Sequence, residues 1–195
     1  MSRIIKAKAL RAKRTVALAR WLLGKHLVRR GEDGRVVARM ILETEAYDGE
    51  RDLACHARAG RTRRTAVLYA PGGHWYVYLC YGIHEMLNLV VGPRDWPAAI
   101  LLRGVEGANG PGRVTKALGI GRALNGATAT GRASGLWIED RGMRVSRRAV
   151  SATPRVGVDY AGAVWAGKRW RFVLEAPTKA PGRPRPKSTS APRRA

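Results

Sequence analysis

Short runs rich in apolar residues recur along the chain and are separated by turn-forming residues. The runs at 25–30, 35–45, 75–81, 86–91, 98–106, 136–139, 142–147, 156–159 and 169–175 predict β-strands. A helix is predicted at 15–23, where Leu18, Trp21 and Leu22 form an apolar stripe. A second helix is predicted at 113–118, between Gly110-Pro111-Gly112 and Gly119. Many short strands with few helices predict an α+β protein: a single mixed domain built on a curved antiparallel β-sheet with a few peripheral helices.

Turn and cap residues set the predicted boundaries of these elements. Thr15 is a candidate cap for the first helix, and Gly24 is suited to end it. The Asp33-Gly34 pair predicts a hairpin turn between the first two strands. Residues 48–73 are polar and Gly-rich and are expected to form a long loop, within which one short helix is possible. Residues 121–134 are expected to form another loop.

The net charge of the chain is unusually high for a small domain. The 195 residues carry a net charge of +23, and no apolar run approaches the roughly 18 residues of a membrane span. Residues 1–14 and 177–195 hold six basic residues each and no acid, which leaves +11 on residues 15–176. We therefore expect a basic flexible arm at 1–14, one domain at 15–176, and a basic, Pro-rich, disordered tail at 177–195. Such a charge favours a nucleic-acid partner, although a GC-rich genome that inflates arginine content is an alternative cause.

The acidic residues stand out against this basic background. Glu43 and Glu45 end an apolar strand and share one of its faces, which Tyr47 continues, and His56 follows after an acidic turn. A glutamate on a strand is usually solvated, and Glu43 is expected at the surface or paired with an arginine. Arg103 lies in an apolar strand and needs a partner, for which Glu45 is one candidate. Such a pair would keep the carboxylate ionised, as a general base requires.

Aromatic residues follow in the strand at 75–81. Such a strand most often forms part of a β-core. Tyr76 and Tyr78 nevertheless share a face and, together with Tyr47, would suit a slot for a planar base, where stacking is worth about 1–3 kcal/mol per base. Tyr81 comes where the strand ends, and a large side chain on such a turn could act as a wedge between base steps.

The sequence contains none of the common metal-binding or cofactor-binding motifs. The four histidines form no HExxH motif and no zinc-deaminase pattern, and no Walker-type loop is present. Cys55 and Cys80 form no CxxC pair and are most simply buried thiols. We therefore expect no metal and no cofactor, and a chemistry that uses water and a carboxylate.

Several of these segments together resemble the alkyladenine (3-methyladenine, methylpurine) DNA glycosylase family. The matching segments are residues 18–25, 43–47, 54–58, 71–82, 87–88, 101–103, 110–118 and 154–158. The resemblance implies a monofunctional glycosylase that flips alkylated (3-methyladenine-type) or deaminated purines out of duplex DNA and hydrolyses the N-glycosidic bond. It also implies a monomer that acts on double-stranded DNA in the bacterial cytoplasm, with the nucleoid. Residues 61–66 depart from the family's usual Thr-Pro-Arg-Asn-like run.

The resemblance also implies a role for each site residue. Glu45 would activate the attacking water, which Arg103 and the carbonyl of Val156 would help to hold. The remaining roles concern the base: Tyr47 and Tyr78 would stack on it, His56 would hydrogen-bond it or its sugar-phosphate, Tyr76 would complete the pocket wall, Asn88 would guard against the amino group of guanine, and Tyr81 would fill the gap in the base stack. The alternative is a non-catalytic basic nucleic-acid-binding protein in which the tyrosines are core residues.

Overall fold

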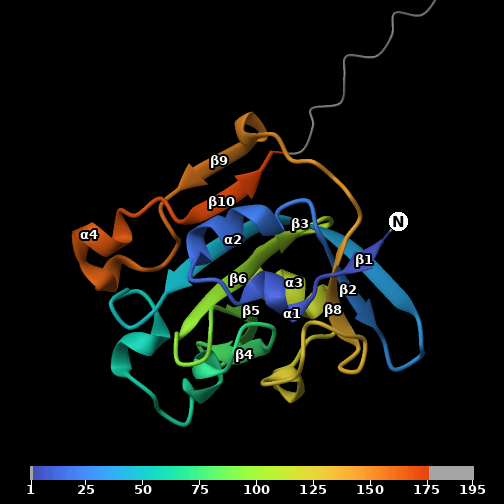
Figure 1. The fold of residues 1–195 in the computed structure, drawn as a ribbon, viewed down its shortest axis with the longest axis horizontal. Helices are drawn as coiled ribbons and strands as arrows, with labels where there is room; N and C mark the ends of the chain where they lie inside the picture. The colour runs from blue at the N-terminus through green and yellow to red at the C-terminus, as the bar shows by residue number, and fades with distance from the viewer. Residues whose placement is uncertain (1, 176–195) are drawn as a thin grey trace, which may run out of the picture.

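The fold is an open antiparallel sheet with short helices around it (Figure 1). A computed structural model describes residues 2–175, so the tail expected at 177–195 lies outside the described residues. Within this range the strands are β1 Arg3–Ile4, β2 His26–Arg30, β3 Val36–Asp48, β4 Trp75–Cys80, β5 His84–Val91, β6 Ala98–Val105, β7 Ala108–Asn109, β8 Leu136–Asp140, β9 Val150–Thr153 and β10 Arg171–Leu174. The antiparallel sheet with few helices confirms the predicted α+β class.

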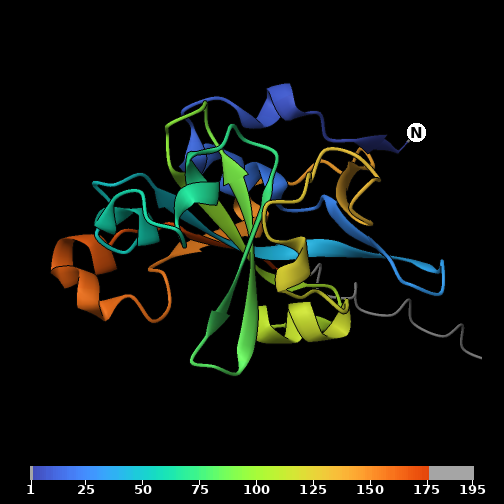
Figure 2. The ribbon, with the colours of Figure 1, turned by 90° about the horizontal axis from the view of Figure 1, so that it is seen from below.

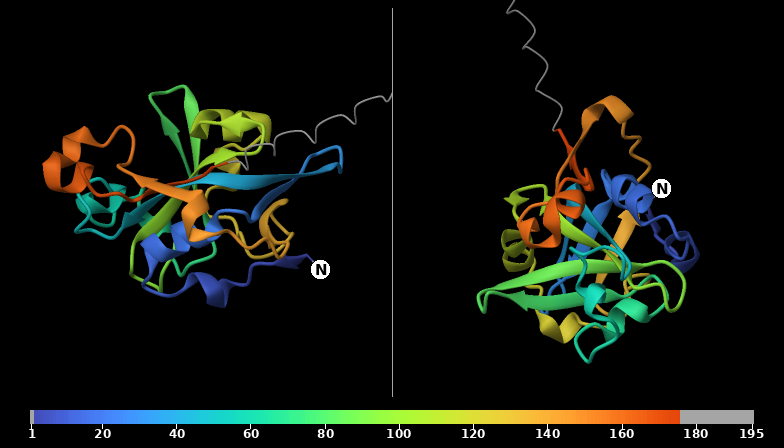
Figure 3. Two further views of the ribbon diagram at one scale, coloured as in Figure 1. Left: turned by 90° about the horizontal axis from the view of Figure 1, so that it is seen from above. Right: turned by 90° about the vertical axis from the view of Figure 1, so that its left-hand side faces the viewer.

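The helices are short. The α-helices are α1 Ala7–Leu10, α2 Thr15–Leu22, α3 Pro111–Ala117 and α4 Gly162–Ala166, and the 3₁₀-helices are η1 His56–Ala59, η2 Ala66–Tyr69, η3 Arg122–Leu124, η4 Arg147–Ala149 and η5 Asp159–Ala161. In Figure 2 the β4–β5 hairpin extends away from the body of the molecule, with α3 beside it. Figure 3 shows α4 at the end of the molecule opposite the N-terminus.

Strand β3 organises the sheet, whose main order is β1-β8-β2-β3-β6-β5-β4. It is 13 residues long, and one of its edges pairs first with β2 and then, from Glu43 to Glu45, with β10. Its other edge pairs with β6, and the register shifts around Glu43. Strand β3 is therefore shared by two parts of the sheet. Its second half, residues 43–48, lies between β10 on one side and β6, β5 and β4 on the other.

The main core lies on one face of this second half. Ala46, Ile100, Leu89 and Trp75 lie opposite one another on β3, β6, β5 and β4, and all four are fully buried. Full burial of a large apolar side chain contributes about 1.5–3 kcal/mol, so this row is a strong part of the core. Helix α2 packs on the same side of β3, where the Thr44 hydroxyl donates a 2.8 Å hydrogen bond to the carbonyl of Ala19. The residues that precede and follow these four along their strands point to the opposite face of the sheet.

Four local predictions were wrong. Of the two cysteines expected to be buried thiols, Cys55 is buried but Cys80 is only partly buried. Residues 3–10 are not a loose arm, because β1 pairs with β8 and the side chains of Ile5 and Leu10 are buried in the core. Thr15 does not cap α2, since its hydroxyl donates to Asp48 and the N-cap position belongs to Arg14. No strand forms at 142–147 or at 156–159, and β9 lies between these segments.

The missing strands have packing reasons. Val145 and Met143 cover Gly24 at the end of α2, so their apolar character reflects contact with that turn. Gly157 has a φ of 72°, a left-handed conformation that breaks an extended strand after β9. The segment 154–158 turns instead toward the face of the sheet opposite the main core, where Val156 and Val158 line a cavity.

Candidate active site

A row of side chains crosses four strands on the face opposite the main core. Glu45 on β3 lies opposite Leu101 on β6, Leu101 lies opposite Asn88 on β5, and Asn88 lies opposite Tyr76 on β4. Paired strands are about 4.8 Å apart, so these residues form one line across the sheet. Antiparallel pairing thus brings together residues that are far apart in the sequence.

A cavity of about 920 Å³ opens over this row. Its volume lies within the range of about 300–1,000 Å³ that is typical of small-molecule sites, and a purine fits such a space. All nine residues that the sequence pointed to line the cavity: Glu45, Tyr47, His56, Tyr76, Tyr78, Tyr81, Asn88, Arg103 and Val156. The structure therefore brings the whole predicted set together, while the role of each residue stays a prediction.

Glu45 is fully buried in the cavity wall. Its Oε1 accepts a 2.9 Å hydrogen bond from the backbone N–H of Val156, and its Oε2 accepts a 2.8 Å hydrogen bond from the Tyr47 hydroxyl. Arg103 Nε lies 3.6 Å from Oε1. Burial raises the pKa of Glu45, and Arg103, the Val156 N–H and the Tyr47 hydroxyl oppose that rise. The carboxylate is held in one orientation and lies close to several groups that favour its charge.

The main partner of Arg103 is Glu43. Its Nε lies 2.8 Å from Glu43 Oε1, and Arg171 Nε on β10 reaches the same oxygen at 2.5 Å. Glu43 is buried, so of its two expected placements the arginine-paired one is confirmed. Two arginines thus share one structural carboxylate, and Arg103 is fixed beside Glu45 without being neutralised by Glu45 alone.

Aromatic rings form the rest of the wall. The His56 Nδ1 lies 3.0 Å from the Tyr76 hydroxyl, and the His56 and Tyr78 ring centroids are 4.6 Å apart. Burial lowers the pKa of His56 to about 4, with help from Arg64 and Arg58, so its ring is neutral at neutral pH. The neutral imidazole offers both a donor and an acceptor for hydrogen bonds.

Asn88 is held by the backbone of the β4–β5 hairpin. Its Nδ2 donates to the carbonyl of Tyr76 at 3.2 Å and to the carbonyl of Met86 at 3.3 Å. The side chain is buried and borders the cavity. A fixed amide at this point limits which groups on a planar ligand can approach the sheet.

Tyr81 stands at the tip of the same hairpin. It has a φ of 51°, which is uncommon for a residue other than glycine, and it is 91 % exposed. The tip is the part of the hairpin that extends from the body of the molecule (Figure 2). The N–H of Ile83 donates a 3.1 Å hydrogen bond to the carbonyl of Cys80, so the positive φ of Tyr81 belongs to the hairpin turn. The turn presents the large ring to solvent at the rim of the cavity.

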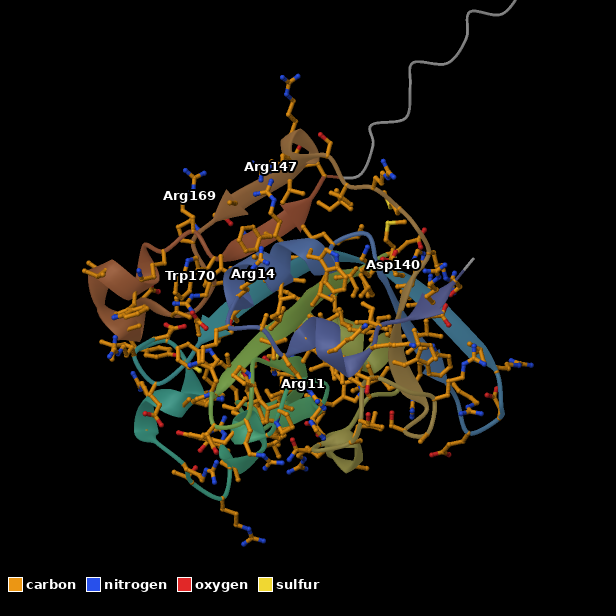
Figure 4. The ribbon with its side chains drawn as sticks, viewed as in Figure 1. Arg11, Arg14, Asp140, Arg147, Arg169 and Trp170 are labelled. Carbon is orange, nitrogen blue, oxygen red and sulfur yellow. The ribbon has the colours of Figure 1, made fainter. Side chains whose placement is uncertain are left out.

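An ion pair that the sequence did not reveal supports the site. Arg155 and Asp52 are fully buried and joined by two hydrogen bonds of 2.5 and 2.9 Å. The Arg155 guanidinium lies 4.8 Å from the Tyr47 ring centroid and 5.1 Å from that of Trp170, which Figure 4 shows near α4. This pair holds the segment before Val156 against β3. The pair of Arg155 and Asp52 could not be predicted from the sequence, because Arg155 directly precedes residues 156–159, for which a strand is predicted.

Comparison with known proteins shows the family of this chain. The family model for methylpurine-DNA glycosylase (MPG) matches residues 9–108 and 106–178, and the chain belongs to this family. It is therefore a DNA glycosylase, a hydrolase that acts on N-glycosyl bonds, and its substrate is DNA. Residues 2–175 include no helix long and apolar enough to span a membrane, while the monomeric state and the cellular location stay predictions.

Relatives match along most of their length. A protein of Methanocella arvoryzae is 46 % identical over 179 residues, covering 81 % of this chain and 86 % of that protein. Proteins of Anaeromyxobacter sp. (strain Fw109-5) and Myxococcus xanthus are each 44 % identical, covering 90 % and 83 % of this chain and 93 % and 85 % of their own lengths. All three bear the name "Putative 3-methyladenine DNA glycosylase".

Proposed function

We propose that this protein extrudes a damaged purine from duplex DNA and hydrolyses its N-glycosidic bond with a water molecule that Glu45 activates. The substrates are alkylated purines of the 3-methyladenine type or deaminated purines, and the reaction starts base excision repair. One observation carries the proposal: the only carboxylate on the cavity wall within the described residues is fully buried and bound by Val156 and Tyr47.

The chemistry suits a single carboxylate. As the glycosidic bond breaks, the sugar acquires oxocarbenium character, and a nearby negative charge stabilises that cation. Glu45 removes a proton from water as the oxygen attacks C1′, and Arg103 helps to hold that water. An alkylated purine is already cationic and leaves readily, so one carboxylate is enough where many sugar hydrolases need two.

The rings supply the binding of the base. Tyr47 and Tyr78 stack on the extruded purine, with Tyr76 and the neutral His56 completing the wall. Extrusion costs a few kcal/mol, least where the lesion already weakens pairing. Tyr81, exposed on its hairpin, enters the space that the base leaves and offsets part of that cost by stacking.

The net charge of +23 serves the search for damage. Contacts between basic side chains and phosphates are independent of sequence and let a protein move along DNA before it meets a lesion. The charge alone would fit the rival function, a basic nucleic-acid-binding protein without catalysis. That rival gives no reason for Glu45 to be buried, since burial of an acid costs free energy.

Base release from defined duplexes tests the proposal. The protein is titrated with duplexes that carry one 3-methyladenine-type lesion or one hypoxanthine, and with undamaged duplex, and the products are heated in alkali to reveal abasic sites. We expect preferential binding of lesion duplex by both the wild type and Glu45→Gln, and strand cleavage only after treatment with the wild type. Equal affinity for all duplexes with no cleavage would support the rival function, and preferential binding without cleavage would indicate a family member that has lost turnover.

A further inference from the structure

Two arginines on the cavity wall, Arg64 and Arg113, have no assigned role, and Arg64 is the one that contacts His56 and Tyr78. Arg64 lies between η1 and η2 and lines the cavity. Its Nη2 lies 3.5 Å from His56 Nε2, and its guanidinium carbon lies 5.1 Å from the centroid of the Tyr78 ring. Arg64 therefore borders the same two side chains that would contact an extruded base.

The charge of Arg64 is not neutralised within the described part of the chain. Over residues 2–175 it forms no ion pair with an acidic side chain. Arg103 and Arg155 behave differently, because Arg103 is paired with Glu43 and Arg155 with Asp52. Arg113 also lines the cavity and, like Arg64, forms no ion pair among residues 2–175. Arg64 is thus a free positive charge at the edge of the slot.

The charge of Arg64 also acts on the neighbouring imidazole of His56. After burial, Arg64 is the next cause of the lowered pKa of His56, so it disfavours a second cation at this place. Its guanidinium also lies over the Tyr78 ring, where a cationic ligand would otherwise gain cation–π stabilisation. Both contacts act against a positively charged base and leave a neutral base unaffected.

We propose that Arg64 is a specificity-determining residue, whose unpaired charge beside the slot lowers the preference of the enzyme for cationic alkylated purines relative to neutral purines such as hypoxanthine. This inference rests on the proposed glycosylase function. The cation in the slot would be an N-alkylated purine nucleotide, such as 7-methylguanine in DNA, whose ring carries the positive charge.

The test compares kcat/KM for duplexes with one 7-methylguanine or one hypoxanthine. In Arg64→Gln we expect the ratio of the cationic to the neutral substrate to rise by about 3- to 10-fold, the effect of a unit charge at about 5 Å in a partly solvated site. Arg64→Lys should keep the ratio close to that of the wild type, because it retains the charge. Arg63→Gln, a change of equal charge at an exposed neighbour that does not line the cavity, is the matched control and should leave the ratio unchanged.

The outcomes separate the two proposals. An unchanged ratio in Arg64→Gln, with both rates reduced equally, would overturn the specificity role and make Arg64 a plain phosphate contact. A wild type that releases neither base would contradict the proposed function itself.

Discussion

The backbone N–H of Val156 donates a 2.9 Å hydrogen bond to Oε1 of Glu45 across 111 residues of sequence. A backbone donor cannot lose its proton at working pH, so this contact fixes the carboxylate at any pH that the enzyme meets. The segment that carries Val156 is itself held by the buried pair of Arg155 and Asp52. The orientation of Glu45 on β3 therefore depends on two further segments, the one that carries Arg155 and Val156 and the one that carries Asp52.

The first prediction concerns the pH dependence of base release from a neutral lesion. The Tyr47 hydroxyl lowers the pKa of Glu45 against the rise that burial causes. Tyr47→Phe removes the hydroxyl and keeps the ring, so the pKa of Glu45 should rise further. Because the ionised form is active, the acid limb of the profile of kcat against pH should move to higher pH.

A matched tyrosine provides the control for this shift. Tyr69 is also buried, and its hydroxyl bonds Glu50 rather than Glu45. Tyr69→Phe should leave the acid limb in place. If Tyr47→Phe has the same acid limb as the wild type, either Glu45 is not the titrating base or the hydroxyl does not act on it.

The second prediction concerns stability. Burial raises the pKa of Glu45 in the folded protein, so its contribution to stability is complete below the ordinary glutamate pKa and is lost as the pH rises through the raised value. At pH 7 this contribution is absent, and Glu45→Gln should raise Tm by about 2–4 °C, the shift that about 1 kcal/mol produces in a domain of this size. Thermal unfolding at several pH values should show that the difference in Tm between Glu45→Gln and the wild type becomes smaller toward about pH 4.

The pKa of Glu139 is shifted in the opposite direction to that of Glu45, so the expected change in Tm is also opposite. Although burial would raise its pKa, hydrogen bonds from Trp137, Ser2 and Arg141 lower it, so its contribution to stability is present at neutral pH and is lost in acid. Glu139→Gln should therefore lower Tm at pH 7. Equal shifts in both variants would show that the environment of Glu45 is not what the structure indicates.

The third prediction concerns Tyr81. Its ring is exposed, so Tyr81→Ala should unfold at nearly the same temperature as the wild type. Base release from duplex should fall by about 5- to 100-fold, because a stacking contact of about 1–3 kcal/mol is lost. Release from single-stranded DNA should hardly change, since no gap forms there, and Tyr81→Phe should retain activity. An equal loss on both substrates would argue against the proposed wedge.

Much of the fold could be predicted from the sequence because its signals are local. Helix α2 and strands β2 to β6 follow apolar patterns and turn residues such as Gly34, and their boundaries differ from the predictions by only a few residues. The N-terminal segment could not be predicted in this way. Its charges suggested an arm, yet burial of Ile5 and Leu10 outweighs them and docks the segment on the core.

The sequence predicted which residues line the site, but not how their side chains are paired. Glu45, Tyr47 and Arg103 lie where strand alternation places them, but the sequence could not show that Glu43 is the main partner of Arg103. The pairing depends on the register shift around Glu43, a feature of the assembled sheet. The link from Arg155 to Asp52 joins residues 103 positions apart and has no local sequence signal.

The central claim is that Glu45 acts as the general base, and single-turnover base release by Glu45→Gln tests it most directly. Glutamine preserves the shape of the side chain and cannot take a proton, so the first-order rate on a hypoxanthine duplex should fall by about 10²–10⁴-fold while lesion binding is retained. Glu50→Gln, which changes an exposed carboxylate outside the cavity, should keep the wild-type rate. A Glu45→Gln rate within a few-fold of the wild type would contradict the account.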